Sequence, residues 1–193
     1  MAEVKGLYIA LLHYPMVDRE GKVVATALTP INVPDIARTA CTYGVRTYFV
    51  VTPLATQRRI AERLRDFWVK DEKWPLRQQA LRLVEVREEL EQCYREIEEA
   101  EGEPPEVWGT SGRVGLPYPM LGWEEARRRL RERPVLLLFG TGNGMAEELL
   151  SACDFLLPPL RAGGYNNLSV RAAVAIILDR LKGEEHDGNG RSH

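Results

Sequence analysis

Short runs of apolar residues, separated by longer stretches of helical character, place the strongest constraint on how this chain can fold. The clearest runs are Leu7–Leu12, Thr47–Val51 and residues 134–139, which contain almost no polar side chains. Runs of this length and composition are typical of parallel strands that helices cover on both faces. Their alternation with helical segments predicts an α/β fold in which a parallel sheet is flanked by helices.

The same patterns predict the remaining secondary structure. A helix is expected to begin at Val33, with Pro34 in its first turn, and to end near Gly44. Residues 55–101 are mostly helix formers, interrupted by an irregular segment at 68–75. Further helices are expected at 123–133, 145–151 and 169–181, and further extended segments at 23–28, 106–108 and 154–157.

Length and composition indicate a single globular unit. The chain has 193 residues, of which 45% are hydrophobic, so we assign residues 1–182 to one domain. Residues 183–193 are polar and contain glycine, and we expect a disordered tail. No apolar run approaches the ~20 residues of a membrane-spanning helix, and the first residues do not resemble a secretory signal. We therefore expect a cytoplasmic protein without a membrane segment.

The cysteines and histidines give no indication of a metal site. Cys41, Cys93 and Cys153 are widely spaced and form no CxxC pair, which predicts buried thiols and neither disulfides nor zinc ligands. His13 is the one histidine outside the polar tail. Because it follows a strand, a hydrogen-bonded structural role is favoured over a catalytic one.

Arginine is clustered in two parts of a chain whose formal net charge is only -2. Guanidinium groups bind phosphates and stack on bases, so these clusters could position RNA. Alternatively, they are solvated helix faces whose arginines pair with neighbouring glutamates such as Glu124, Glu125 and Glu132. The clusters are Arg58, Arg59, Arg63 and Arg65, and Arg127, Arg128, Arg129, Arg131 and Arg133.

Glycine-rich segments follow two of the predicted strands near the C-terminus. Phe139 is followed by Gly140-Thr141-Gly142-Asn143-Gly144, and the strand at 154–157 is followed, after Pro158, by residues 163–170. Glycine after a strand is common turn chemistry, but it also allows a ligand to approach the backbone closely. Successive segments of this kind that end at a helix favour a ligand pocket.

These segments resemble the motifs of the SPOUT superfamily of S-adenosylmethionine-dependent RNA methyltransferases. Motif one is similar to residues 32–45, motif two to residues 136–158, and motif three to residues 167–170 with the helix that follows. A bacterial group of single-domain members is especially similar, through HYP at 13–15, DIARTACTYGV at 35–45, LFGTGNGMA at 138–146 and the segment 165–181. The resemblance covers nearly the whole chain and implies a deep C-terminal trefoil knot.

The resemblance also implies a cofactor, S-adenosylmethionine, held in a pocket of three loops without a metal. Leu157 and Leu168 would flank the adenine, and backbone groups of the loops would bind its edge. The implied cofactor-binding residues are Thr110, Ser111, Gly112, Phe139, Gly140, Thr141, Gly142, Leu157, Pro158, Tyr165, Asn166, Asn167, Leu168 and Ser169.

The catalytic residue implied by motif one is Arg38, whose cation would hold a phosphate or stabilise a developing alkoxide. An ion pair between Arg38 and Asp35 on the same helix is the structural alternative. Asn32, and Asp35 as a possible base, are weaker candidates, and His13 and Asn166 remain in consideration.

The implied partners are a tRNA or rRNA substrate and a second copy of the chain, because the family forms its active site across a two-fold interface. Ribose-methylating members carry Glu in motif two, where this chain has Gly142 or Asn143, and Ser-Leu-Asn in motif three, where it has residues 167–169. Both a base nitrogen, such as guanine N1, and a ribose 2'-hydroxyl therefore stay open as acceptors. A knotted protein that binds S-adenosylmethionine or RNA without turnover is the alternative function. The motif order disfavours an ordinary nucleotide-binding α/β enzyme.

Overall fold

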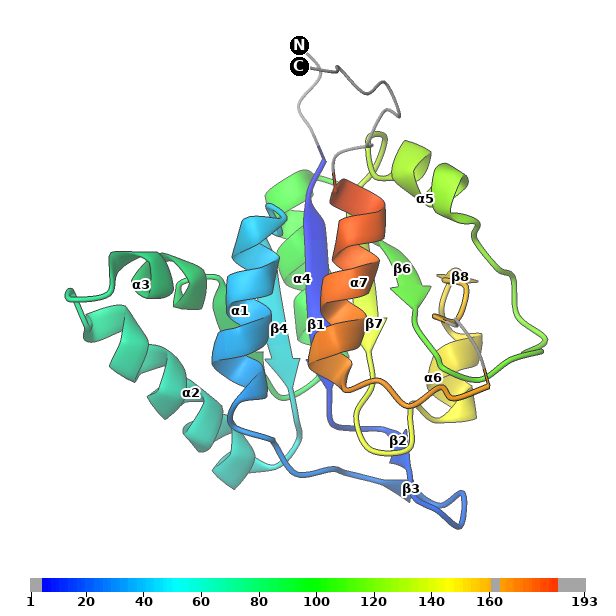
Figure 1. Cartoon of the computed structure of the whole chain (residues 1–193), viewed down its shortest axis with the longest axis horizontal. Coiled ribbons are helices and arrows are strands. Elements are labelled where there is room, and N and C mark those ends of the chain that lie inside the picture. The colour runs from blue at the N-terminus through cyan, green and yellow to red at the C-terminus, as the bar shows by residue number, and fades with distance from the viewer. Residues whose placement is uncertain (1–4, 161–163, 184–193) are drawn as a thin grey trace, which may run out of the picture.

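Six parallel strands form the central sheet, in the order β5-β4-β1-β7-β6-β8 (Figure 1). The computed structural model describes residues 5–160 and 164–183, so nearly all of the predicted tail lies outside the described residues. The parallel α/β sheet predicted from the apolar runs is confirmed. The strands are β1 (Leu7–Leu12), β4 (Thr47–Val51), β5 (Val84–Arg87), β6 (Glu106–Gly109), β7 (Val135–Phe139) and β8 (Phe155–Leu156).

Strand β1 shows why an apolar run becomes a central strand. Successive side chains point to opposite faces of a sheet, so a strand covered on both sides needs apolar residues throughout. Leu7, Ile9 and Leu11 pack into the core on one face, while Tyr8 and Leu12 belong to the core on the other. All six residues of β1 are buried.

Helices cover both faces of the sheet (Figure 1). The core on one face includes residues of α1, α2, α3, α5 and α7, and the core on the other includes residues of α4 and α6. No helix among the described residues is both long and apolar enough to span a membrane. The helices are α1 (Asn32–Thr42), α2 (Ala55–Lys70), α3 (Pro75–Leu81), α4 (Leu90–Glu101), α5 (Trp123–Arg129), α6 (Glu147–Ser151) and α7 (Val170–Lys182).

The segment 55–101 differs from the sequence-based prediction, which assigned it mostly to helices. Residues 84–87 form the edge strand β5, which pairs with β4 in parallel. Val84 and Val86 are buried, and Glu85 and Arg87 alternate with them toward the other face. This period of two is a strand signal, but four residues between two helices were too few to distinguish it from helical spacing.

A small hairpin follows β1 and forms a separate sheet of β2 (Met16–Val17) and β3 (Val23–Val24). The Asp18 carboxylate accepts hydrogen bonds from the amides of Glu20 and Lys22, which closes the turn between the two strands. Gly21 supplies the positive φ of 80° that the turn requires. The predicted extended segment 23–28 is thus a strand only over its first two residues.

The chain order of the strands marks where a ligand can bind. From β1 the chain runs outward through β4 and β5, and it then returns to the other side of β1 with β6, β7 and β8. In open α/β sheets, ligands bind beyond the carboxyl ends of the strands, at the point where this direction reverses. The loops after β6, β7 and β8 all lie at that edge.

Candidate active site

A cavity of about 400 Å³ lies at the carboxyl edge of the sheet, between the loops that follow β6, β7 and β8 and the first turns of α7. Sites for small ligands typically have volumes of about 300–1,000 Å³. The cavity is lined by Thr110, Ser111, Gly112, Arg113, Phe139, Gly140, Gly142, Asn143, Gly144, Met145, Pro158, Leu160, Asn166, Asn167, Leu168, Val170, Ala173 and Ile177.

The loop after β7 is held by the end of β1 and by the β2–β3 hairpin. The Thr141 hydroxyl donates to the Leu12 carbonyl at 2.9 Å, and the Val17 amide donates to the Gly144 carbonyl at 3.0 Å. Gly142 and Gly144 have φ values of 59° and 107°, which side-chain-bearing residues rarely adopt. These hydrogen bonds and the two glycine conformations fix the loop, and Gly142 and Gly144 line the cavity.

Gly140 has a packing requirement as well. A Cβ atom at this position would lie 2.8 Å from Met145 Cγ and 3.2 Å from the Met145 amide nitrogen. The first distance is shorter than real Cβ contacts and the second is tighter than most of them, so a side chain at Gly140 requires Met145 to shift.

The loop after β6 is tied to both of its neighbours. The Thr110 hydroxyl donates to the Leu138 carbonyl at 2.8 Å, and the Asn166 amide group donates to the Gly112 carbonyl at 2.8 Å. The Arg113 guanidinium donates to the Met145 carbonyl at 3.0 Å. Segments far apart in the sequence thus form one continuous wall.

The structure places most of the predicted cofactor-binding residues in this lining. Four have other surroundings: Thr141 anchors its loop to β1, and Leu157 is buried in the core at 2% exposure. Tyr165 is 82% exposed, and the Ser169 hydroxyl caps α7 by accepting from the Ala172 amide. Sequence reasoning missed the lining residues of α7 because their spacing is also that of an ordinary core-facing helix.

The lining is mostly neutral, and Arg113 is its one charged residue among those that the structure describes. Hydroxyl, amide and backbone groups of the loops provide donors and acceptors, and Phe139, Leu168 and Ile177 provide apolar surface. This combination fits S-adenosylmethionine, which has a polar adenosine, a cationic sulfonium and a methionine chain that ends in an amino and a carboxylate group. No Asp, Glu or His lines the described part of the cavity, so its wall offers no conventional general base.

The predicted catalytic residues lie on α1 and do not line the cavity. Asn32 is buried at the start of α1, and Arg38 is exposed farther along the helix. Asp35 accepts from Arg171 of α7 at 2.9 Å, which ties the two helices together. Within the described ranges Arg38 has no ion pair, so the expected alternative, a pair between Arg38 and Asp35, does not form.

His13 has the structural environment that the sequence favoured. It is fully buried, and its Nδ1 donates to the Val51 carbonyl at 3.3 Å, while no described residue pairs with Nε2. Burial lowers the pKa of His13 below its usual value, which keeps the ring neutral. The residue is not part of the cavity lining.

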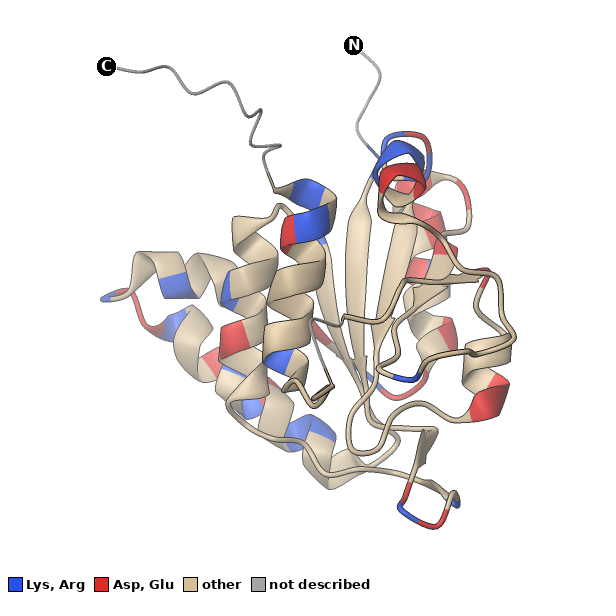
Figure 2. Cartoon of the chain, turned by 45° about the vertical axis from the view of Figure 1, so that its right-hand side comes forward, with Lys and Arg blue, Asp and Glu red and all other residues tan. Residues whose placement is uncertain are grey.

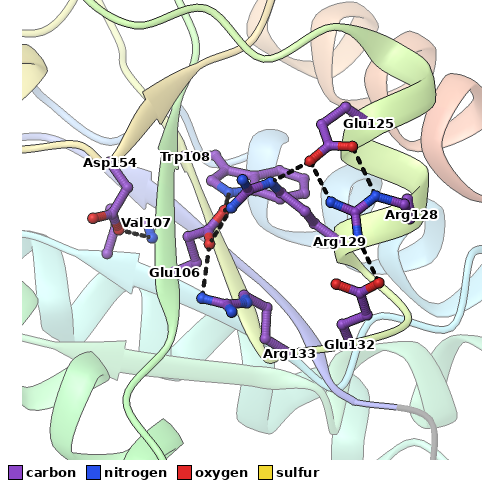
Figure 3. Close-up of polar contacts among 9 residues, drawn as sticks. All are labelled: Glu106, Val107, Trp108, Glu125, Arg128, Arg129, Glu132, Arg133 and Asp154. Carbon is purple, nitrogen blue, oxygen red and sulfur yellow. Dashed lines mark hydrogen bonds and ion pairs between the residues drawn. The ribbon is translucent and has the colours of Figure 1, made fainter.

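Arginines of α5 and of the segment that follows it are engaged in ion pairs (Figure 3). Arg128 pairs with Glu125 and Glu132, and Arg129 pairs with Glu125. Arg129 and Arg133 also bind the carboxylate of Glu106, which is 8% exposed. The alternative of paired arginines is therefore confirmed for Arg128, Arg129 and Arg133, whereas Arg131 has no ion pair with a described residue; Glu106, and not Glu124, supplies the buried carboxylate.

Two further sequence expectations concern metals and thiols. Within residues 5–160 and 164–183, no group of three or more His, Cys, Asp or Glu side chains could hold a metal ion. The three cysteines are free thiols. Cys93 and Cys153 are buried as predicted, whereas Cys41 is only partly buried.

Comparison with solved structures identifies proteins of the same fold. The structure is similar to a crystal structure of the SpoU methyltransferase AviRb from Streptomyces viridochromogenes in complex with the cofactor AdoMet. The TM-score is 0.59 and the sequence identity 17%, over 94% of this chain and 60% of the other. At this identity the likeness shows the fold alone.

The sequence itself establishes the family. Residues 6–183 match the model of a family described as SAM-dependent RNA methyltransferase, and the chain belongs to that family. The resemblance to SPOUT methyltransferases is thereby confirmed, and S-adenosylmethionine (AdoMet, SAM) is the cofactor of the family.

Two relatives show how far the similarity extends. An uncharacterised protein of Aquifex aeolicus is 37% identical over 181 residues, which are 92% of this chain and 88% of that protein. A tRNA (guanine-N(1)-)-methyltransferase of Oleidesulfovibrio alaskensis is 44% identical over 184 residues, which are 93% of this chain. The chain spans only 43% of the length of this second relative.

Proposed function

We propose that this protein is an S-adenosylmethionine-dependent methyltransferase that acts on RNA, with tRNA or rRNA as its substrate. The observation that carries the proposal is the cavity at the carboxyl edge of the sheet, because its walls include the three loops in which the resemblance to the family places the cofactor. The size and polarity of the cavity suit the cofactor, as described above.

The cofactor would supply an electrophilic methyl group, and the chain would bind and orient the two reactants. In the proposed site, backbone groups of the loops after β6 and β7 bind the polar parts of the cofactor, and Leu168 and Ile177 contact its apolar parts. Methyl transfer is an in-line displacement, so orientation provides much of the rate enhancement.

We further propose that the protein is a homodimer in which Arg38 of one protomer serves the cavity of its partner. Two features support this role: Arg38 is exposed on α1, and it makes no ion pair with any described residue. A cation that is neither neutralised nor in contact with its own cavity is available to a bound phosphate or a developing negative charge. Asn32 and Asp35 then support α1, Asp35 through its ion pair with Arg171.

The proposed reaction transfers the methyl group either to a base nitrogen or to a ribose hydroxyl. The relative from Oleidesulfovibrio is named for the N1 atom of guanine, which supports a base nitrogen. However, this chain corresponds to less than half of that protein, so the named activity is not transferred to it. Binding of the cofactor or of RNA without turnover is the alternative function.

The trefoil knot and the cytoplasmic location complete the proposal. The knot is supported by the contact between Asn166 and Gly112, which brings the chain that precedes α7 against the loop after β6. A cytoplasmic location is supported by the proposed RNA substrate.

Two measurements test the proposed function. Calorimetry should show binding of S-adenosylmethionine and no comparable binding of ATP. Incubation with labelled cofactor and RNA from a strain that lacks the protein, followed by nucleoside mass spectrometry, should identify one methylated nucleoside and its modified atom. Arg38→Ala should reduce transfer at least about 100-fold while leaving cofactor affinity unchanged. Cofactor binding without transfer to any RNA would instead support the non-catalytic alternative.

A further inference from the structure

The outer face of α2 carries a stripe of cations interleaved with exposed apolar side chains. Arg59, Arg63 and Lys70 are exposed, and Ile60 and Phe67, which are 39% and 62% exposed, lie between them. The spacing of three and four residues places these five side chains on one side of the helix. We call this set the α2 stripe.

The turn between α2 and α3 extends the stripe with aromatic surface. Trp74 is 59% exposed, although tryptophan is usually buried in a protein of this size. The guanidinium of Arg77 lies 4.1 Å from the centroid of the Trp68 ring and 6.0 Å from that of Trp74. These contacts hold cationic and aromatic groups side by side at the surface.

The charge of this region is opposite in sign to that of the whole chain. Residues 55–82 contain eight Lys or Arg and four Asp or Glu, whereas the formal net charge of the chain is -2. Figure 2 shows blue segments along α2 and α3 on one side of the molecule. Among the described residues Arg59, Arg63 and Lys70 take part in no ion pair, in contrast to the neutralised arginines of α5.

The location of α2 relates the stripe to the cavity. Because α2 follows β4, its first turn lies at the carboxyl edge of the sheet, the edge that holds the cavity (Figure 1). The Gln57 side chain accepts from the Leu28 amide at 2.7 Å, which fixes this turn to the segment that precedes α1. From Arg59 to Lys70 the stripe is about 16 Å long, enough to contact a few nucleotides.

We propose that the α2 stripe and Trp74 form a docking surface for RNA, on which cations contact the phosphate backbone and aromatic rings stack on unpaired bases. The proposal rests on the proposed function, which supplies RNA as the partner. Charge complementarity favours RNA over a second copy of the chain, because a two-fold contact would place Arg59, Arg63 and Lys70 against the same cations.

Charge reversal with a matched control tests the stripe. The test variant is Arg59→Glu/Arg63→Glu in the full chain. The control is Arg95→Glu/Arg131→Glu, which makes the same charge change at exposed arginines of α4 and of the turn after α5, neither of which has an ion pair with a described residue. The probe is total bacterial tRNA, with rRNA as a second probe for the wild type, and the affinities are measured by filter binding at several salt concentrations.

We expect the test variant to bind tRNA at least about tenfold more weakly than the control variant at 0.1 M salt. The slope of log affinity against log salt should become shallower by about 1.5, because two phosphate contacts are lost. Trp74→Ala should weaken binding at least about fivefold, which corresponds to the loss of one stacked base. Cofactor affinity should stay at the wild-type value in every variant.

Each other outcome contradicts the proposal in a recognisable way. If the test and control variants have equal tRNA affinity while the wild type binds tRNA and transfers methyl groups, the stripe is not the docking surface and the proposed function stands. If the wild type binds the cofactor but no tRNA or rRNA, RNA as the substrate is wrong, and the stripe proposal fails with it. If the test variant changes the sedimentation coefficient and not the tRNA affinity, the stripe is an interface between copies of the chain.

Discussion

Replacement of Glu106 by glutamine tests whether the α5 arginines are structural. The Glu106 carboxylate, at the start of β6, accepts from Arg129 at 2.9 and 3.2 Å, from Arg133 at 3.2 Å and from the Trp108 indole at 2.7 Å (Figure 3). Glutamine has nearly the same shape and retains an oxygen acceptor for Trp108. The substitution therefore removes the negative charge while leaving the packing of β6 in place.

The expected cost is about 2 kcal/mol of unfolding free energy. A hydrogen bond to a charged group contributes about 1.5–3 kcal/mol, which applies to Arg129, whose side chain is 25% exposed. The Arg133 side chain is 50% exposed and adds at most about 1 kcal/mol. For a chain of this length a loss of about 2 kcal/mol lowers the melting temperature by about 4–8 °C. Glu106→Ala, which also leaves the buried Trp108 indole without an acceptor, should cost about 4 kcal/mol.

Urea denaturation and thermal melting followed by circular dichroism measure these differences. The matched control is Glu132→Gln, which breaks an ion pair with Arg128 whose two side chains are about half exposed. We expect the control to have little effect on stability, because solvent screens an exposed ion pair. Equal destabilisation by Glu106→Gln and Glu132→Gln would refute the reasoning, because burial of Glu106 would then add nothing to the interaction.

Three further predictions follow from the geometry. Gly140→Val should weaken binding of S-adenosylmethionine at least about tenfold while the protein stays folded, since its side chain displaces the loop against Met145; unchanged affinity in calorimetry would remove Gly140 from the site. At pH 8 a thiol reagent should modify Cys41 and leave Cys93 unmodified, because burial raises the pKa of Cys93 to about 12; mass spectrometry of the native protein locates the label. Hydrogen bonds from the Arg128 and Arg129 guanidinium groups lower the pKa of Glu125 to about 2, below its usual 4.5. The contribution of ionised Glu125 to stability is therefore present above pH 4.5 and is lost between pH 4.5 and 2. The stability difference between the wild type and Glu125→Gln should shrink over that range, and a difference that stays constant to pH 2 would contradict the assignment.

Local sequence patterns were sufficient to predict the helices and strands whose secondary structure does not depend on their tertiary neighbours. Strands β1 and β7 are apolar throughout, which only a strand buried on both faces explains. Helix α1 has a proline in its first turn, so its start was recognisable from local chemistry. The glycines after β7 similarly indicated a loop that a ligand can approach.

The sequence by itself determined that this chain forms a parallel α/β sheet and predicted a ligand pocket in its C-terminal loops, where the structure has a cavity, because periodicity and glycine chemistry are local properties. Only the tertiary structure showed that Asp35 pairs with Arg171 and not with Arg38, and that Glu106 neutralises arginines of α5. It likewise assigned residues 84–87 to an edge strand. These outcomes depend on which segments lie side by side after the chain has folded. The residues that then meet are far apart in the sequence, and no local pattern indicates their contact.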